Sequence, residues 1–242
     1  LPFEKAFYDQ HQVPCSFVGH PLADDIPLVS DKIYARKGLS LVQDVKILAL
    51  MPGSRGSELS KLVEPFLKAA LQLHANDNKL VFIAPMISKK RAIQFEALKL
   101  KFAPKLPVQV IINKTQAVMA ASDCLLTASG TVTLEAALIK RPMVICYKFN
   151  LLTYFIAKLM VKLKWFSLPN LLADKELVPE LLQNAVCPEQ IVPLIKARLY
   201  TDQSVLDQAF TDIHLSLKQN ASEKAADAVI ELLPAEINTV KL

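Results

Sequence analysis

The stretch that decides the fold class is ILALMPGSRGSELSKLVEPFLKAA, residues 47–70. Its first five residues, Ile47–Met51, are all apolar and predict a strand that is buried on both faces. A Pro-Gly-Ser-Arg turn follows and leads into a helical pattern. The turn matches neither G-x-G-x-x-G nor G-x-x-x-x-G-K-[ST], the two standard phosphate-binding patterns. The stretch therefore predicts a strand-turn-helix unit whose turn carries an arginine, Arg55, instead.

Short apolar runs alternate with helical patterns on both sides of this turn. The expected strands are Val45–Met51, Leu80–Ala84, Val108–Ile112, Asp123–Thr127 and Met143–Tyr147. The expected helices between them are Val63–His74, Lys89–Phe102, Thr115–Ala121 and Thr131–Lys140. The first helix is placed near Val63 because Pro65 in a helix interior would cost about 3 kcal/mol or more. The alternation predicts an α/β protein with a doubly wound parallel sheet covered by helices on both faces.

The two ends of the chain do not follow this alternation. Residues before 45 predict a helix, a short strand at Cys15–Val18 and an extended loop, with a domain boundary near Pro27–Asp31. After Tyr147 no further strand is expected. The later helices are expected near Pro188–Tyr200, Gln203–Gln219 and Ala221–Leu233. We therefore divide the chain into a remnant of a preceding domain and linker (1–30), a Rossmann-like domain (31–200), and C-terminal helices with a tail (201–242).

Composition narrows the class of ligand. The chain has 242 residues, of which 52% are hydrophobic, enough for one large domain with a core. The net charge of +5 is compatible with a phosphate-bearing ligand or an anionic membrane surface. The four cysteines are far apart and none lies at metal-binding spacing from another cysteine or a histidine. No metal, cofactor or nucleic-acid partner is expected.

Two further features bear on the setting of the chain. The segment Asn150–Phe166 is apolar, but three lysines interrupt it and it is shorter than the ~20 residues that span a membrane. It predicts either a buried helix or a surface helix that contacts lipid, with Trp165 at the boundary. The chain begins with Leu1, without a signal peptide, and this favours a fragment that lacks its N-terminal part.

The candidate binding residues follow the ends of the expected strands, where doubly wound sheets bind ligands. In the first turn, which includes Ser54, Gly53 and Gly56 allow a ligand to approach closely, and Arg55 offers a planar charged group to phosphate oxygens. The alternative is an ordinary turn with a solvated arginine.

A second turn, Ser129, Gly130 and Thr131, opens a helix whose free N–H groups favour an anion. Glu135 in that helix is placed to accept hydrogen bonds from a ribose diol, or else only complements the helix dipole. A third segment, residues 167–174, contains Asn170 among apolar neighbours, where it either contacts a ligand or caps a turn.

Four segments of the chain resemble lipid-A-disaccharide synthases, in order and with matching spacing from Leu1 to about Leu233. They are LPFEKAFYDQHQVPCSFVGHPLADDIP, LALMPGSRGSE, ASGTVTLEAALIKRPMVICYK and SLPNLLADKELVPELLQ. The resemblance covers the later half and a little more of the family's chain. It implies an inverting, metal-independent glycosyltransferase of the GT-B fold. Such an enzyme transfers diacylglucosamine from its UDP carrier to diacylglucosamine 1-phosphate (lipid X) in lipid A synthesis.

The resemblance also assigns roles to matching residues. It implies that Arg55 binds the donor diphosphate, that Glu135 binds the ribose, and that Asn170 lies near the donor. Ser129, Gly130 and Thr131 match the turn that opens the family's helix, and His20 matches a histidine of a loop between domains.

The resemblance implies that the family's acceptor site and proposed general base belong to a preceding domain, which we expect this chain to lack. We therefore expect the chain to bind UDP without turnover. The family is peripheral on the cytoplasmic face of the inner membrane, and a homodimer is compatible with the resemblance. The alternatives are another UDP-sugar enzyme, such as a UDP-N-acetylglucosamine epimerase, and a stand-alone nucleotide-binding module.

Overall fold

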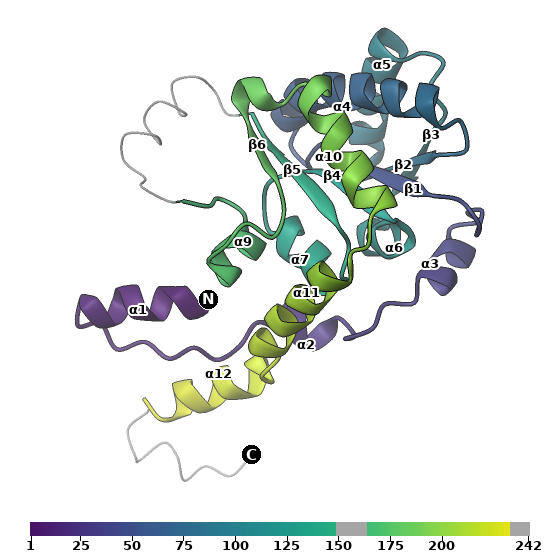
Figure 1. Cartoon of the computed structure of the whole chain (residues 1–242). Helices are drawn as coiled ribbons and strands as arrows, with labels where there is room; N and C mark the ends of the chain where they lie inside the picture. Colours follow the sequence, from purple (N-terminus) through teal and green to yellow (C-terminus); the bar gives the residue numbers. More distant parts are fainter. Residues whose placement is uncertain (149–163, 233–242) are drawn as a thin grey trace.

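The computed structural model describes residues 1–148 and 164–232 of the chain (Figure 1). Its centre is a six-stranded sheet in the order β3-β2-β1-β4-β5-β6, in which every neighbouring pair is parallel. The strands are β1 (Ile47–Met51), β2 (Val81–Met86), β3 (Val108–Ile112), β4 (Cys124–Ala128), β5 (Met143–Tyr147) and β6 (Glu180–Leu182). This confirms the prediction of a doubly wound, Rossmann-like parallel sheet.

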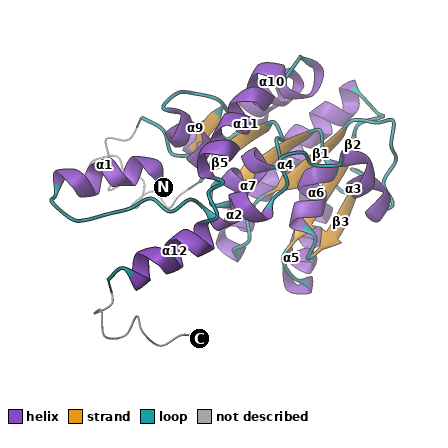
Figure 2. Ribbon diagram, turned by 90° about the horizontal axis from the view of Figure 1, so that it is seen from below, coloured by secondary structure: helices purple, strands orange, loops and turns teal. Residues whose placement is uncertain are grey.

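Helices cover both faces of the sheet (Figures 1 and 2). The helices before β4 are α1 (Pro2–Gln10), α2 (Pro21–Asp25), α3 (Lys32–Gly38), α4 (Gly56–Asn76), α5 (Lys89–Phe102) and α6 (Thr115–Ala121). Those after β4 are α7 (Val132–Leu138), α9 (Leu168–Ala173), α10 (Pro188–Tyr200), α11 (Ser204–Leu217) and α12 (Ala221–Ile230). A short 3-10 helix at Gln183–Ala185 joins β6 to α10. In both views α1 and α12 extend from the same side of the body.

The strand β1 shows why the sheet needs two cores. All five of its residues are buried, and successive side chains point to opposite faces. Ile47, Ala49 and Met51 join the core formed with α6, α7 and α11. Leu48 and Leu50 join the core formed with α4, α5 and α10. A run of five apolar residues is therefore what a strand covered on both faces requires.

The strand order places two distant turns side by side. β1 pairs with β2 on one side and with β4 on the other, so the direction of winding changes between β1 and β4. The end of β1, Met51, lies opposite Thr127 of β4. The turns that follow these two strands therefore meet at the carboxyl edge of the sheet, where ligands bind in doubly wound folds.

The start of α4 corrects the prediction from Pro65. The helix begins at Gly56, not near Val63, and Pro65 lies in its interior. The added turns bury Leu59 and Leu62, each contributing roughly 1.5–3 kcal/mol. That contribution offsets the cost of about 3 kcal/mol for a proline inside a helix.

Other predictions near the ends of the chain also need correction. The structure contains a sixth strand, β6, which pairs with β5, so the strands do not stop at Tyr147. Residues Cys15–Val18 form no strand. The apolar segment Asn150–Phe166 lies outside the described residues except for residues 164–166. Within the described part of the chain, no helix is both long and apolar enough to cross a membrane.

Candidate functional site

A cavity of about 510 Å³ opens at the carboxyl edge of the sheet, between the turns after β1 and β4. It brings together seven of the predicted residues: Gly53, Ser54, Arg55, Ser129, Gly130, Thr131 and Glu135. Glu58, Thr115, Thr127 and the end of β2 complete its walls. The two turns are more than seventy residues apart in sequence, and the β1–β4 pairing is what joins them.

The arginine turn is closed by a carboxylate from its own helix. Glu58 Oε2 accepts hydrogen bonds from the N–H groups of Ser54 at 3.0 Å and Arg55 at 3.1 Å. Glu58 Oε1 lies 3.0 Å from Arg55 Nη1. Gly53 has a φ of +106°, and a Cβ at this position would lie 2.2 Å from Glu58 Oε2. Glycine is therefore required both by the backbone angle and by the carboxylate packed against it.

Glu58 was not among the residues predicted for the site. Its signal in the sequence is the spacing of a capping box. In that motif the side chain of the third helical residue accepts a hydrogen bond from the backbone N–H of the residue that precedes the helix. Arg55 is that preceding residue and Glu58 is the third residue of α4. The Arg55 side chain is 81% exposed, and the residue lines the cavity from this closed turn.

The second turn is fixed to β5 and to its own helix. The Ser129 N–H donates to the Cys146 carbonyl at 3.3 Å, and Thr133 Oγ1 donates to the Gly130 carbonyl at 2.8 Å. A Cβ at Gly130 would meet no atom within 4 Å, so the turn faces open space. Glu135 is half-buried on the cavity wall, and its carboxylate has no hydrogen-bond partner among the described residues. It is therefore free to accept hydrogen bonds from hydroxyl groups of a ligand.

A neighbouring hollow lengthens the site. It has a volume of about 520 Å³ and shares Ile87, Thr115 and Glu135 with the first cavity. Asn113 and Lys114, between β3 and α6, line its far side. Glu135 thus lines both hollows. The arrangement suits an elongated ligand with hydroxyl groups near its middle and an anionic group near Arg55.

Asn170 does not line either hollow. Its side chain is fully buried. Its Nδ2 donates to the Val178 carbonyl and to Glu180 Oε1, each at 2.8 Å. Its Oδ1 accepts from the N–H groups of Leu177 at 2.8 Å and Val178 at 3.0 Å. The amide therefore fastens α9 to the strand β6, and all four of its hydrogen-bonding positions are used within the protein.

His20 lies away from the cavity, in the segment that precedes the sheet. Its Nδ1 accepts from the Leu22 N–H at 3.2 Å and so caps α2. The backbone N–H of His20 donates to the Leu217 carbonyl at the end of α11. Burial lowers the pKa of His20 from its usual value, which favours the neutral ring. The Asp24 carboxylate accepts from the N–H groups of Asn220 and Ala221, so this loop is joined to the start of α12.

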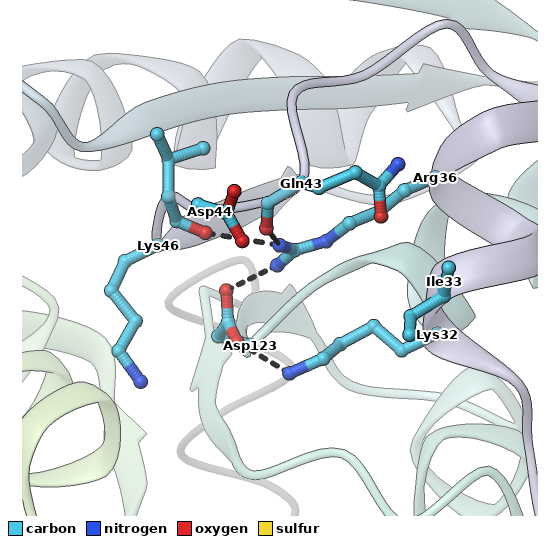
Figure 3. A pocket seen from close by; sticks show the side chains of 8 residues that line it. Lys32, Ile33, Arg36, Gln43, Asp44, Lys46 and Asp123 are labelled. Carbon is cyan, nitrogen blue, oxygen red and sulfur yellow. Dashed lines mark hydrogen bonds and ion pairs between the residues drawn. The ribbon is translucent and has the colours of Figure 1, made fainter.

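A third hollow lies at the opposite edge of the sheet, where β1 and β4 begin (Figure 3). Asp123 Oδ1 lies 2.9 Å from Lys32 Nζ, and Oδ2 lies 2.7 Å from Arg36 Nη2. The same carboxylate accepts from the Ile47 N–H at 2.7 Å. Because these groups satisfy one another, the cluster joins α3 to the sheet and is not a candidate binding site. Among the described residues, no group of three or more His, Cys, Asp or Glu side chains is arranged to hold a metal.

Known proteins resemble this chain in sequence and in fold. A family model described as lipid-A-disaccharide synthetase matches residues 1–237. A lipid-A-disaccharide synthase of Colwellia psychrerythraea is 67% identical over 237 residues, which are 98% of this chain and 60% of the relative. One of Pseudoalteromonas translucida is 48% identical over 97% of this chain and 62% of the relative. The chain thus spans about three fifths of the length of the curated relatives that it matches.

Solved structures of low sequence identity share the fold. WaaG, a glycosyltransferase involved in lipopolysaccharide biosynthesis, matches with a TM-score of 0.52 and 19% identity, over 87% of this chain and 51% of that one. A UDP-bound structure of MnaA from S. aureus matches with a TM-score of 0.57 and 14% identity, over 89% of this chain and 55% of that one. At these identities the likeness concerns the fold alone, that of one half of a GT-B protein.

Proposed function

The chain belongs to the lipid-A-disaccharide synthetase family, and on that premise we propose that it is the donor-binding part of a hexosyltransferase of lipid A synthesis. In this proposal the donor is UDP-diacylglucosamine and the acceptor is diacylglucosamine 1-phosphate (lipid X). The products are the lipid A disaccharide 1-phosphate and UDP.

One observation carries the proposal. Arg55 lies in the turn after β1, Glu135 lies in the helix that follows the adjacent strand β4, and both line the same cavity. A guanidinium binds phosphate oxygens with charge-assisted hydrogen bonds, and a carboxylate without an internal partner accepts hydrogen bonds from a diol. A nucleoside diphosphate presents these two groups side by side. In the proposed complex its diphosphate lies at Arg55, its ribose at Glu135, and its base in the neighbouring hollow.

The proposed chemistry assigns Arg55 to the leaving group. The acceptor hydroxyl oxygen attacks the anomeric carbon, and the bond from that carbon to the diphosphate oxygen breaks. UDP leaves with the electron pair of that bond, and Arg55 stabilises the negative charge that develops on its diphosphate, because a fixed cationic group stabilises charge that develops in the transition state. The attack inverts the anomeric centre and requires a base to take the hydroxyl proton. We assign that base to a part of the relatives that precedes this chain, and we propose that this chain alone binds UDP without turnover.

Several predictions from the sequence stay predictions. They include the division into residues 1–30, 31–200 and 201–242, and the role of His20 between domains. They also include attachment to the cytoplasmic face of the inner membrane, contact with anionic lipid, and a homodimer. The buried position of Asn170 favours a structural role for its amide over direct contact with the donor.

Calorimetry with UDP tests the proposal. We expect saturable binding to the purified chain and weaker binding by Glu135→Gln, because an amide is a poorer acceptor for the ribose hydroxyls than a carboxylate. Glu96→Gln, on the surface of α5, is the matched control and should bind as the wild type does. Failure of the wild-type chain to bind UDP would overturn the proposal. Disaccharide formation by the chain alone would overturn the assignment of the base.

A further inference from the structure

Among the described residues, the Glu58 side chain makes its hydrogen bonds to the arginine turn. Its two carboxylate oxygens contact the Ser54 N–H, the Arg55 N–H and Arg55 Nη1, at 3.0, 3.1 and 3.0 Å. The Glu58 side chain is 27% exposed, whereas that of Glu64, further along the same helix, is 43% exposed. Glu58 is thus a partly buried carboxylate on the wall of a cavity that is proposed to hold an anion.

These contacts determine what the turn can offer a ligand. The N–H groups of Ser54 and Arg55 already donate to Glu58, so they are not open to a phosphate unless Glu58 moves. The guanidinium uses one of its nitrogens for Glu58 and has further N–H groups that no other described residue accepts from. The group that this turn offers to a ligand is therefore the Arg55 side chain, which the ion pair with Glu58 restrains.

We infer that Glu58 is a positioning residue, which orients Arg55 toward the diphosphate of the donor. The inference rests on the proposed function. An exposed arginine has many rotamers, and binding a ligand must remove that freedom at a cost in affinity. An ion pair that restricts the side chain before the ligand arrives removes part of the cost. Gly53 is part of the same device, since any larger residue would displace the carboxylate.

A second effect of Glu58 has the opposite sign. A carboxylate near a bound diphosphate repels it and weakens binding. If repulsion dominates, removal of the charge tightens UDP binding. If positioning dominates, removal of the Glu58 charge weakens UDP binding. That weakening then occurs only in a chain that retains Arg55. The two effects are therefore separable by experiment.

The test is a double-mutant cycle of Glu58→Gln and Arg55→Ala, with UDP binding measured by calorimetry. A glutamine oxygen can still accept from the Ser54 and Arg55 N–H groups, but its NH₂ group cannot accept from Arg55. We expect Glu58→Gln to raise the Kd for UDP about 3- to 10-fold and to have no effect in the Arg55→Ala background. Glu64→Gln, which breaks a surface ion pair with Lys68 on the same helix, is the matched control and should leave the Kd unchanged.

Three results would overturn the inference: tighter binding by Glu58→Gln, an unchanged Kd, or equal weakening in both backgrounds. The last would mean that Glu58 acts on the fold of the turn and not through Arg55. Thermal unfolding of each variant verifies that it is folded at the temperature of the measurement. If the wild-type chain does not bind UDP, the proposed function itself fails. If the wild type binds UDP and Glu58→Gln binds it with the same Kd, only this inference fails.

Discussion

Asp123, the residue before β4, accepts a hydrogen bond from Arg36 Nη2 of α3 at 2.7 Å, across 87 residues of sequence. Both side chains are nearly buried, with 9% and 4% exposed, respectively. The Arg36 guanidinium also donates to the carbonyls of Ala121, Gln43 and Val45. The pair thus joins the segment before β1 to the edge of the sheet that lies opposite the candidate site.

Asp123→Asn is expected to destabilise the fold. The change leaves the buried Arg36 charge without its carboxylate, and breaking a buried pair in this way costs on the order of 3–5 kcal/mol. Urea unfolding measures the loss. Asp44→Asn, an exposed aspartate in the same hollow, is the control and should be nearly neutral. A loss below about 1 kcal/mol would show that the pair behaves as a surface ion pair.

The same residue gives an acid dependence of stability. Burial opposes the ionisation of Asp123, but hydrogen bonds from Lys32 and the Ile47 N–H, with the Lys32 and Arg36 charges, lower its pKa below the usual 3.8. The carboxylate therefore contributes its full stability above about pH 3.8, and the contribution is lost as the pH falls through the lower pKa of the folded state. The difference in unfolding free energy between wild type and Asp123→Asn should shrink over that range. A constant difference would contradict this assignment.

Arg55→Ala is expected to weaken UDP binding by about 1.5–3 kcal/mol, because charge-assisted hydrogen bonds to the diphosphate are lost. Arg55→Lys should recover only part of that energy, since an ammonium lacks the planar fork of a guanidinium. Calorimetry gives both values. Lys37→Ala removes an equal charge from the surface of α3 and should leave the Kd unchanged. Full recovery by lysine would show that charge alone matters at this position.

Gly53→Ala is expected to lower both stability and UDP affinity. The residue has a φ of +106°, and the new Cβ would meet Glu58 Oε2 at 2.2 Å. The strain of the backbone alone costs about 1 kcal/mol or more. Gly38→Ala is a matched control, because a Cβ there meets no atom within 4 Å and the residue ends a helix. Unchanged stability of Gly53→Ala in thermal unfolding would refute the tight packing of Glu58 on the turn.

Asn170→Ala tests whether this amide is structural. The change leaves the N–H groups of Leu177 and Val178 and the Val178 carbonyl without a partner in a buried region. Unpaired buried groups cost about 1–3 kcal/mol each, so we expect a loss of at least about 2 kcal/mol in urea unfolding. A variant of wild-type stability with impaired UDP binding would instead support direct contact between Asn170 and the donor.

Cysteine reactivity gives an independent check of the core. Burial raises the pKa of the Cys124 thiol to about 12, and burial raises that of Cys146 further. Both are buried within the sheet, whereas Cys15 and Cys187 are partly exposed. A thiol reagent should therefore modify Cys15 and Cys187 in the folded chain, and all four cysteines only in denaturant. Mass spectrometry after labelling locates the modified residues, and rapid labelling of Cys124 would contradict the burial of β4.

All five strands predicted from apolar runs are present in the sheet, within two residues of the predicted bounds. Val108–Ile112 and Met143–Tyr147 were predicted with the bounds that the structure has. The strand β6 was missed because it has only three residues and begins with Glu180, whose carboxylate binds the α9 segment. Its formation depends on pairing with β5, which no local pattern reveals.

The candidate site was predictable to the level of residue types at strand ends. Seven predicted residues line one cavity, because the rule for parallel sheets fixes where turns meet. Asn170 was grouped with them since an isolated polar residue looks the same in sequence whether it binds a ligand or fastens a loop. Glu58 was missed because its role depends on a side chain that folds back on the preceding turn.

Because β1 pairs directly with β4, the cavity is formed by two parts of the chain that a single cut can separate. A cut in the loop between β3 and α6 would yield one piece that carries Arg55 and another that carries Glu135. Neither piece would hold a whole binding site. The site would form again only when β1 of one piece pairs with β4 of the other. Nucleotide binding would then report fragment complementation, because a ligand that contacts both pieces stabilises their association.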